Sequence, residues 1–173
     1  HLLYFAGKVN SREIDNLKKE AESIGKGKDF WAWVMAQDDS ERSHGVTIDV
    51  SMVEFETEHL NLTVLDAPGH RDFVPNMIAG ASQADAALLV VDAGNLLIER
   101  GQAREHLLLC RSLGVTSVII AINKMDTLEY SQASYDDAVK RMTALIQSIG
   151  MKAMAFIPIS ASNGDNLKER SQE

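Results

Sequence analysis

Three long apolar runs, separated by segments with helical patterns, constrain this chain more than any other feature of its sequence. The runs cover residues 86–91, 115–122 and 153–159, and the helical patterns cover residues 102–113 and 135–149. A strand that is apolar at nearly every position is typical of a parallel sheet buried on both faces. The alternation of such strands with helices indicates a doubly wound, mostly parallel α/β fold. All three strands are therefore predicted to be fully buried.

The amino-terminal part of the chain has a different pattern. Residues 11–24 carry apolar side chains at helical spacing, residues 46–56 alternate apolar and polar positions as a strand does, and residues 60–65 form a second strand. The short polar connection between these two strands predicts one antiparallel hairpin. Because no linker or repeat divides the chain, we expect one domain over residues 1–173.

Composition excludes several other classes of protein. The chain has 173 residues, enough for a sizeable core, and a net charge of −8, which argues against a generalised nucleic-acid-binding surface. Cys110 is the single cysteine, so an internal disulfide is excluded, and its apolar surroundings predict a buried, inert thiol. No apolar run is long enough to span a bilayer and no signal-peptide pattern is present. We therefore expect a cytoplasmic protein.

A polar turn follows the strand at 60–65 and reads Asp-Ala-Pro-Gly-His over residues 66–70. Open α/β sheets bind ligands at the carboxyl ends of their strands. Asp66 is suited to bind Mg²⁺ through a water, and Gly69 has no Cβ, so its N–H can approach a terminal phosphate. His70 is then placed to orient a water for in-line attack on that phosphate. The alternative is a plain turn with a surface histidine.

A second polar turn, Asn-Lys-Met-Asp at residues 123–126, follows the apolar run at 115–122. The Asp126 carboxylate can accept hydrogen bonds from N1 and N2 of guanine, and it would repel the edge of adenine. Asn123 can bond the base and tie neighbouring loops, while the aliphatic stem of Lys124 can lie over the ring. Guanine reading is the favoured interpretation, and an ordinary polar loop is the alternative.

Two weaker signals point to the same chemistry. Ser160, Ala161 and Ser162 follow the third apolar run, and their backbone N–H groups could meet O6 of guanine. The Thr47 hydroxyl could complete a magnesium shell, although a β-branched strand residue explains Thr47 equally well. The sequence has no Gly-x-x-x-x-Gly-Lys-Ser/Thr loop to hold phosphates, since the pair at residues 7–8 is followed by valine.

Taken in this order, the motifs resemble the GTPase domain of translational GTPases of the elongation factor 1-alpha type. The resemblance covers nearly the whole chain and is most specific over residues 41–50, 66–85, 101–106 and 123–126. It implies a P-loop NTPase-type sheet, GTP or GDP and Mg²⁺ as ligands, and a ribosome as partner. It also implies that Thr47 and Asp66 lie on the magnesium side and that His70 is catalytic. The nucleotide-binding residues implied are Asp66, Ala67, Pro68, Gly69, His70, Asn123, Lys124, Met125, Asp126, Ser160, Ala161 and Ser162.

Three eukaryotic branches of this family compete. Pro75 is similar to the termination and ribosome-rescue branches, whereas residues 45–50 are more similar to rescue or elongation factors. The intersection is the rescue branch of the Hbs type, which partners Pelota, a tRNA mimic, on stalled ribosomes. The alternatives are elongation factor 1-alpha, whose partner would be aminoacyl-tRNA, and the termination GTPase.

The chain also departs from the family pattern. It begins inside the helix that follows the phosphate loop, so the central first strand and that loop are missing, and it stops after Leu167 where the family has a final helix. The loop at 94–100 is short. We expect a fragment of a longer protein, a partial GTP-binding domain that binds GTP weakly or not at all by itself. The alternative is a non-catalytic interaction module that lost nucleotide binding.

Overall fold

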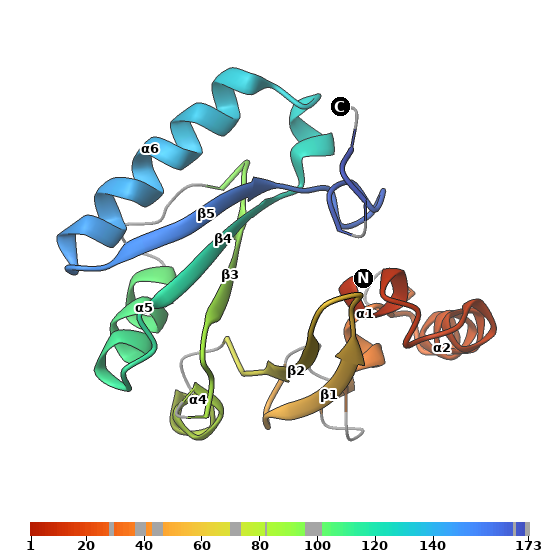
Figure 1. Ribbon diagram of the computed structural model, residues 1–173. Coiled ribbons are helices and arrows are strands. Elements are labelled where there is room, and N and C mark those ends of the chain that lie inside the picture. The colour runs from red at the N-terminus through yellow and green to blue at the C-terminus, as the bar shows by residue number, and fades with distance from the viewer. Residues whose placement is uncertain are drawn as a thin grey trace. The chain divides into compact units, whose positions relative to one another are not determined.

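The chain divides into two compact units, His1–Gly80 and Ala81–Glu173, and each is described here by itself. Figure 1 shows the helices and strands of both units in a computed structural model. The structure describes residues 1–27, 30–36, 41–42, 47–69, 74–81, 83–95, 102–167 and 169–171.

The first unit begins with helices. A short helix, α1 (Leu2–Phe5), precedes α2 (Ser11–Ser23), and a 3-10 turn, η1 (Ala32–Val34), buries Trp33. Asn10 caps α2, because its Oδ1 accepts the N–H of Glu13 at 2.9 Å. Helix α2 turns Ile14 and Ala21 inward, as the predicted apolar stripe requires, but Ile24, at the end of that stripe, is 58% exposed. A further helix, α4 (Val74–Ala81), stands at the end of this unit in the sequence.

The predicted hairpin is confirmed. Strand β1 (Ser51–Glu56) pairs antiparallel with β2 (Asn61–Asp66), so that Ser51 stands opposite Asp66. At the other end, the Thr57 hydroxyl donates to the carbonyl of Leu60 at 3.1 Å, which closes the connection. The first strand is shorter than the alternation over residues 46–56 predicted, because pairing with β2 begins at Ser51. The hairpin therefore delivers Asp66 at the carboxyl end of β2.

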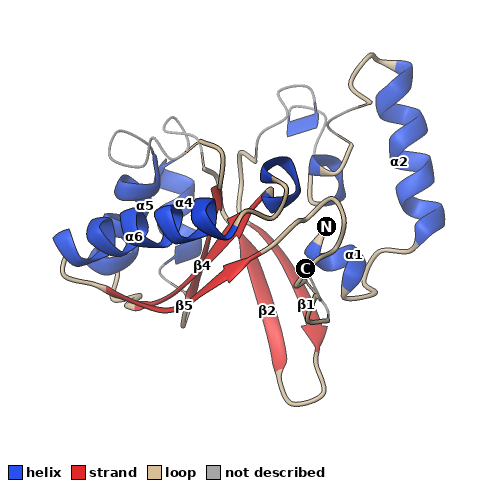
Figure 2. Cartoon of the chain, turned by 90° about the horizontal axis from the view of Figure 1, so that it is seen from above, coloured by secondary structure: helices blue, strands red, loops and turns tan. Residues whose placement is uncertain are grey.

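The second unit is a three-stranded parallel sheet with the order β3-β4-β5. Its strands are β3 (Ala87–Asp92), β4 (Ser117–Asn123) and β5 (Lys152–Pro158). Helices α5 (Gln102–Ser112) and α6 (Gln132–Ser148) pack on it, and Figure 2 shows both helices on the same side of the strands. The centre of the core consists of the fully buried side chains of Leu107, Val118, Ile120, Ile122, Met142 and Ile146. The α/β fold predicted from the sequence is thus confirmed, as is the burial of Cys110.

Full burial of all three strands was the wrong expectation. Only β4 is buried along most of its length; Leu88 and Val90 of β3 are each 54% exposed. Alternate side chains of a strand point to opposite faces, and α5 and α6 pack on one of those faces. Met154 of β5 is 67% exposed and lies where the β4–β5 register shifts. An apolar run therefore does not reveal how many faces of its strand are covered.

Candidate functional site

The turn at residues 123–126 lies at the carboxyl end of β4. Lys124 has a left-handed backbone (φ 66°), which redirects the chain into a 3-10 turn, η3 (Met125–Leu128). Met125 is 4% exposed, and its N–H donates to the carbonyl of Ile159 at 3.2 Å. This buried anchor leaves the flanking side chains of Lys124 and Asp126 at least partly exposed to solvent. The turn is thus built to present polar groups at the sheet edge.

Hydrogen bonds join this turn to the loop after β5. The Asn123 Oδ1 accepts the N–H of Ala161 at 3.0 Å, and Oδ1 of Asp126 accepts the hydroxyl of Ser160 at 2.6 Å. A longer bond of 3.4 Å runs from the Ser162 hydroxyl to Oδ2 of Asp126. The structure therefore brings together all the residues that the sequence assigned to guanine reading in the second unit. An ionised carboxylate offers about four lone-pair sites, so Asp126 retains acceptor capacity for a ligand.

The end of β3 adds a residue that the sequence analysis missed. Asp92 pairs with Asn123 in the β3–β4 register, and its Oδ2 accepts the Lys124 ammonium at 2.7 Å. This bond to Lys124, helped by the N–H of Gly94, lowers the pKa of Asp92. Asp92 could have been found from the sequence, because it directly follows an apolar strand as the other site residues do. Polar residues thus stand at or shortly after the carboxyl ends of all three parallel strands, at one edge of the sheet.

The first unit holds a separate group around Asp66. The Thr47 hydroxyl lies 3.5 Å from Oδ2 of Asp66, so the structure brings together the two predicted magnesium-side residues. Burial raises the pKa of Asp66, the Thr47 hydroxyl opposes that shift, and the nearby Glu41 carboxylate adds to it. A carboxylate and a hydroxyl are oxygen donors of the kind that Mg²⁺ takes together with several waters. The donor set of this group fits that ion.

Two further residues hold the segment that follows Thr47. The buried carboxylate of Glu41 accepts the N–H groups of Ile48 and Asp49, at 2.7 and 3.2 Å. From α4, the amide of Asn76 donates to the carbonyl of Ile48 and to Oδ1 of Asp49, both at 2.8 Å. Contacts from Glu41 and from Asn76 therefore hold the two residues that directly follow Thr47. No local sequence pattern marks Glu41 or Asn76 for this role, and the sequence analysis did not assign it to them.

Comparisons with known proteins identify the family of the chain. The elongation factor Tu GTP-binding domain is the family that matches, over residues 1–172. The chain belongs to this family. Elongation factor 1-alpha of Mucor circinelloides f. lusitanicus is 46% identical over 99% of the chain and 39% of that protein. Elongation factor 1-alpha of Methanocorpusculum labreanum is 50% identical over 98% of the chain and 40% of that protein.

A solved structure supports the same assignment. The crystal structure of sup35 complexed with GDP matches with a TM-score of 0.62 and 27% identity, over 99% of this chain and 35% of that one. The chain spans about two fifths of the length of the curated elongation factors that it matches. It is thus similar to the GTP-binding portion of those proteins.

The structure describes some of the residues predicted to bind nucleotide, and others lie outside its described part. Pro68 is buried and Gly69 is exposed, and their contact with a nucleotide stays a prediction. His70 lies outside the described residues, so its catalytic role stays a prediction, and so does the shortened loop, because residues 96–100 also lie outside them. Within the described part of this domain, no helix is both long and apolar enough to cross a membrane.

Proposed function

We propose that this chain is the guanine-nucleotide-binding part of a translational GTPase and that Asp126 reads the base. One observation carries the proposal: the 2.6 Å bond from the buried Ser160 hydroxyl, which orients the Asp126 carboxylate at the sheet edge. Guanine offers donors at N1 and N2, whereas adenine presents an acceptor at N1. A fixed carboxylate therefore favours guanine over adenine, because a hydrogen bond to a charged group contributes about 1.5–3 kcal/mol.

Two of the three backbone N–H groups of the loop after β5 that could meet O6 of guanine already have acceptors within the protein. The N–H of Ser160 donates to the carbonyl of Asp165 at 3.4 Å, and that of Ala161 donates to Asn123 at 3.0 Å. Because the N–H groups of Ser160 and Ala161 already have acceptors, we assign the contact with O6 of guanine to the N–H of Ser162. Lys124, held by Asp92, would lay its stem along the ring.

For the phosphate end we propose roles in the first unit. Thr47 and Asp66 would hold Mg²⁺, which supplies charge neutralisation at the phosphates. The exposed Gly69 would offer its N–H to the terminal phosphate, and His70 would orient the attacking water. GTP hydrolysis would also need a phosphate-binding loop, which this sequence does not contain, so we assign the activity to a longer protein that includes both. We expect this chain alone to hydrolyse GTP negligibly.

We favour two candidates for the translational role over the termination GTPase, because residues 45–50 are less similar to that branch. The rescue branch, with a Pelota-type partner on the ribosome, is favoured by Pro75, which is exposed in the first turn of α4. The elongation role, with aminoacyl-tRNA as partner, is favoured by the names of the relatives at 46–50% identity. Pull-down of the chain, extended by any coding sequence that flanks it, with a Pelota-type protein or with aminoacyl-tRNA separates the two. Binding of aminoacyl-tRNA alone would exclude the rescue role.

The nucleotide proposal is tested by titrating a fluorescent GDP analogue into the chain and into a version extended by any coding sequence that precedes His1. Binding by the extended version only would support a GTPase whose phosphate site lies upstream. The base assignment is tested with Asp126→Asn, because an amide can donate to the C2 carbonyl of xanthine. We expect that variant to prefer XDP over GDP, and an unchanged preference would contradict the role of Asp126. Asp137→Asn, an exposed position on α6, is the control.

A further inference from the structure

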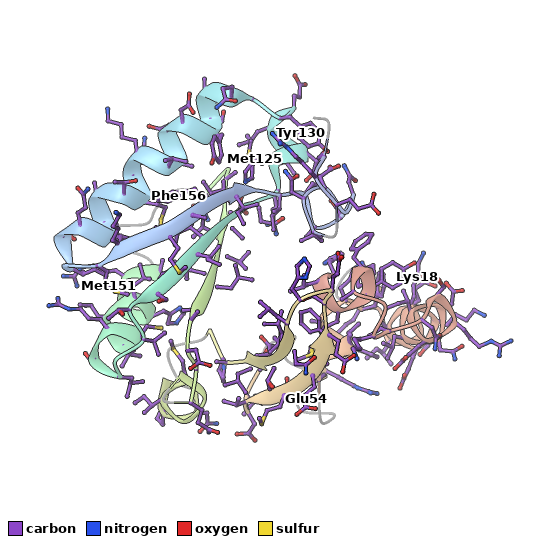
Figure 3. All side chains as sticks on the ribbon, in the orientation of Figure 1. Lys18, Glu54, Met125, Tyr130, Met151 and Phe156 are labelled. Carbon is purple, nitrogen blue, oxygen red and sulfur yellow. The ribbon has the colours of Figure 1, made fainter. Side chains whose placement is uncertain are left out.

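The two guanine-reading loops are joined a second time, away from the residues that would meet the base. The Tyr130 hydroxyl donates to Oδ2 of Asp165 at 2.7 Å and accepts the side-chain amide of Asn163 at 2.9 Å. Tyr130 follows η3 and stands four residues after Asp126, whereas Asp165 stands five residues after Ser160. Figure 3 shows Tyr130 near Met125, at the end of the sheet where these loops lie.

The backbone of the same two loops is strained. Four non-glycine residues in the described part of the chain have a positive φ, and every one of them lies in these loops: Lys124, Glu129, Tyr130 and Asn166. A left-handed backbone is costly for a bulky residue such as tyrosine, whose φ is 52°. Such conformations persist only where surrounding contacts over-determine them, and they cluster at ligand-binding sites. The hydroxyl bonds of Tyr130 are contacts of this kind.

A closed ring of contacts connects the tyrosine to Asp126. The N–H of Asp165 donates to the carbonyl of Ser160 at 3.1 Å, and Ser160 in turn holds the Asp126 carboxylate. On the other side, the N–H of Tyr130 donates to the carbonyl of Met125, the residue before Asp126, at 3.0 Å. The position of the Asp126 carboxylate is therefore determined from both loops.

We propose that Tyr130 and Asp165 form a latch that positions the Asp126 carboxylate and so sets the selectivity for guanine. This inference rests on the proposed nucleotide-binding function. The two residues touch no base; they act through Ser160 and Met125 as positioning residues. The Asp165 bond also raises the pKa of Tyr130, whose hydroxyl is a proton donor at neutral pH even without this shift.

The latch is tested by comparing GDP with IDP, whose hypoxanthine lacks the 2-amino group that Asp126 would read. Both nucleotides are titrated into the version extended by any coding sequence that precedes His1, with and without each substitution. Binding is followed by the amide NMR shifts of the two loops, which detect even weak binding. We expect Tyr130→Phe and Asp165→Ala each to lower the preference for GDP over IDP about threefold to tenfold, the range of one hydrogen bond. The double variant should lose little more than either single one, because both changes remove the same bond.

Tyr135→Phe is the matched control. It also removes one hydroxyl, which donates to the carbonyl of Phe156 at 3.2 Å, but that bond does not join the two loops. The preference for GDP over IDP should not change in this variant. Asp165→Asn keeps an acceptor oxygen for Tyr130 and should retain most of the preference; if it loses as much as Asp165→Ala, the hydrogen bond is not the cause.

The outcomes separate the two proposals. Absence of any preference for GDP over ADP in the extended version without substitutions would overturn the nucleotide-binding proposal and the latch with it. A clear preference in that version, preserved for GDP over IDP in Tyr130→Phe, would overturn the latch alone. If Asp165→Ala does not fold, Asn163→Ala serves instead, since Asn163 is exposed and its amide is the other partner of the tyrosine hydroxyl. We expect Asn163→Ala to lose less of the preference for GDP over IDP than Asp165→Ala does. An unchanged preference in Asn163→Ala would contradict the latch.

Discussion

The Ser160 hydroxyl donates a 2.6 Å hydrogen bond to Oδ1 of Asp126, a residue 34 positions earlier in the chain. Ser160 is fully buried, whereas Asp126 is partly exposed at the end of the sheet. A buried donor fixes the direction of the carboxylate without occupying all of its lone pairs. The acceptor that would read guanine is therefore oriented before any ligand arrives, which reduces the ordering cost of binding.

Ser160→Ala should lower the free energy of unfolding by about 1.5–3 kcal/mol, because it removes a hydrogen bond from a buried hydroxyl to a charged group. It should also weaken guanine-nucleotide binding, since the carboxylate loses its orientation. Urea denaturation measures the first effect and nucleotide titration the second. Ser162→Ala is the control: Ser162 is exposed and its bond to Asp126 is 3.4 Å long, so the loss should stay below about 0.5 kcal/mol. Equal losses would contradict the special role of Ser160.

The sequence predicts much of the fold because the strand ends are visible in it. Each apolar run of the second unit is followed directly by a polar residue, and parallel strands bring their carboxyl ends to one edge, so the proximity of Asn123, Asp126 and Ser160 was predictable. The pairing of Tyr130 with Asp165 was not, because no periodicity or motif encodes a contact 35 residues apart. Burial was overestimated at β3 for a related reason: an apolar strand looks the same whether one face or both faces are covered.

The core of the second unit should be sensitive to truncation of one methionine and tolerant of truncation of another. Met142 of α6 is fully buried against the sheet, so Met142→Ala should cost about 2–5 kcal/mol through lost packing and a cavity. Met154 of β5 is 67% exposed, and Met154→Ala should change stability by less than about 0.5 kcal/mol. Urea denaturation of both variants checks this pair. A large loss in Met154→Ala would mean that this side chain is covered.

Glu41 should control the segment that carries Thr47. Glu41→Ala removes the acceptor of two backbone N–H groups, those of Ile48 and Asp49, so both amides should exchange with solvent faster. Glu41→Gln retains a carbonyl oxygen at the same place and should preserve most of the protection. Hydrogen exchange followed by NMR reports each amide separately. Unchanged exchange at Ile48 in Glu41→Ala would show that other contacts hold this segment.

The Asp92–Lys124 pair should make a small, pH-dependent contribution to stability. Its atoms lie 2.7 Å apart, but the side chains are 34% and 56% exposed, so Asp92→Asn should cost no more than about 1 kcal/mol at neutral pH. Because Lys124 lowers the pKa of Asp92, the unfolded chain binds more protons than the folded one in mildly acidic solution. The contribution is therefore complete above the unfolded pKa of about 3.9 and disappears as the pH falls through the lowered folded value.

Urea denaturation of the unchanged chain and of Asp92→Asn over a series of pH values measures this contribution directly. The two stability curves should run apart at neutral pH and converge in acid, and high salt should narrow the gap because both side chains are partly solvated. Glu54→Gln, which neutralises one exposed carboxylate of β1, should show a smaller gap at every pH. A gap for Asp92→Asn that persists at pH values below the lowered folded pKa of Asp92 would mean that the substitution acts by packing or loop geometry and not through the charge of Asp92. The ion pair between Asp92 and Lys124 would then be rejected as the contact that holds the Lys124 side chain against the end of β3.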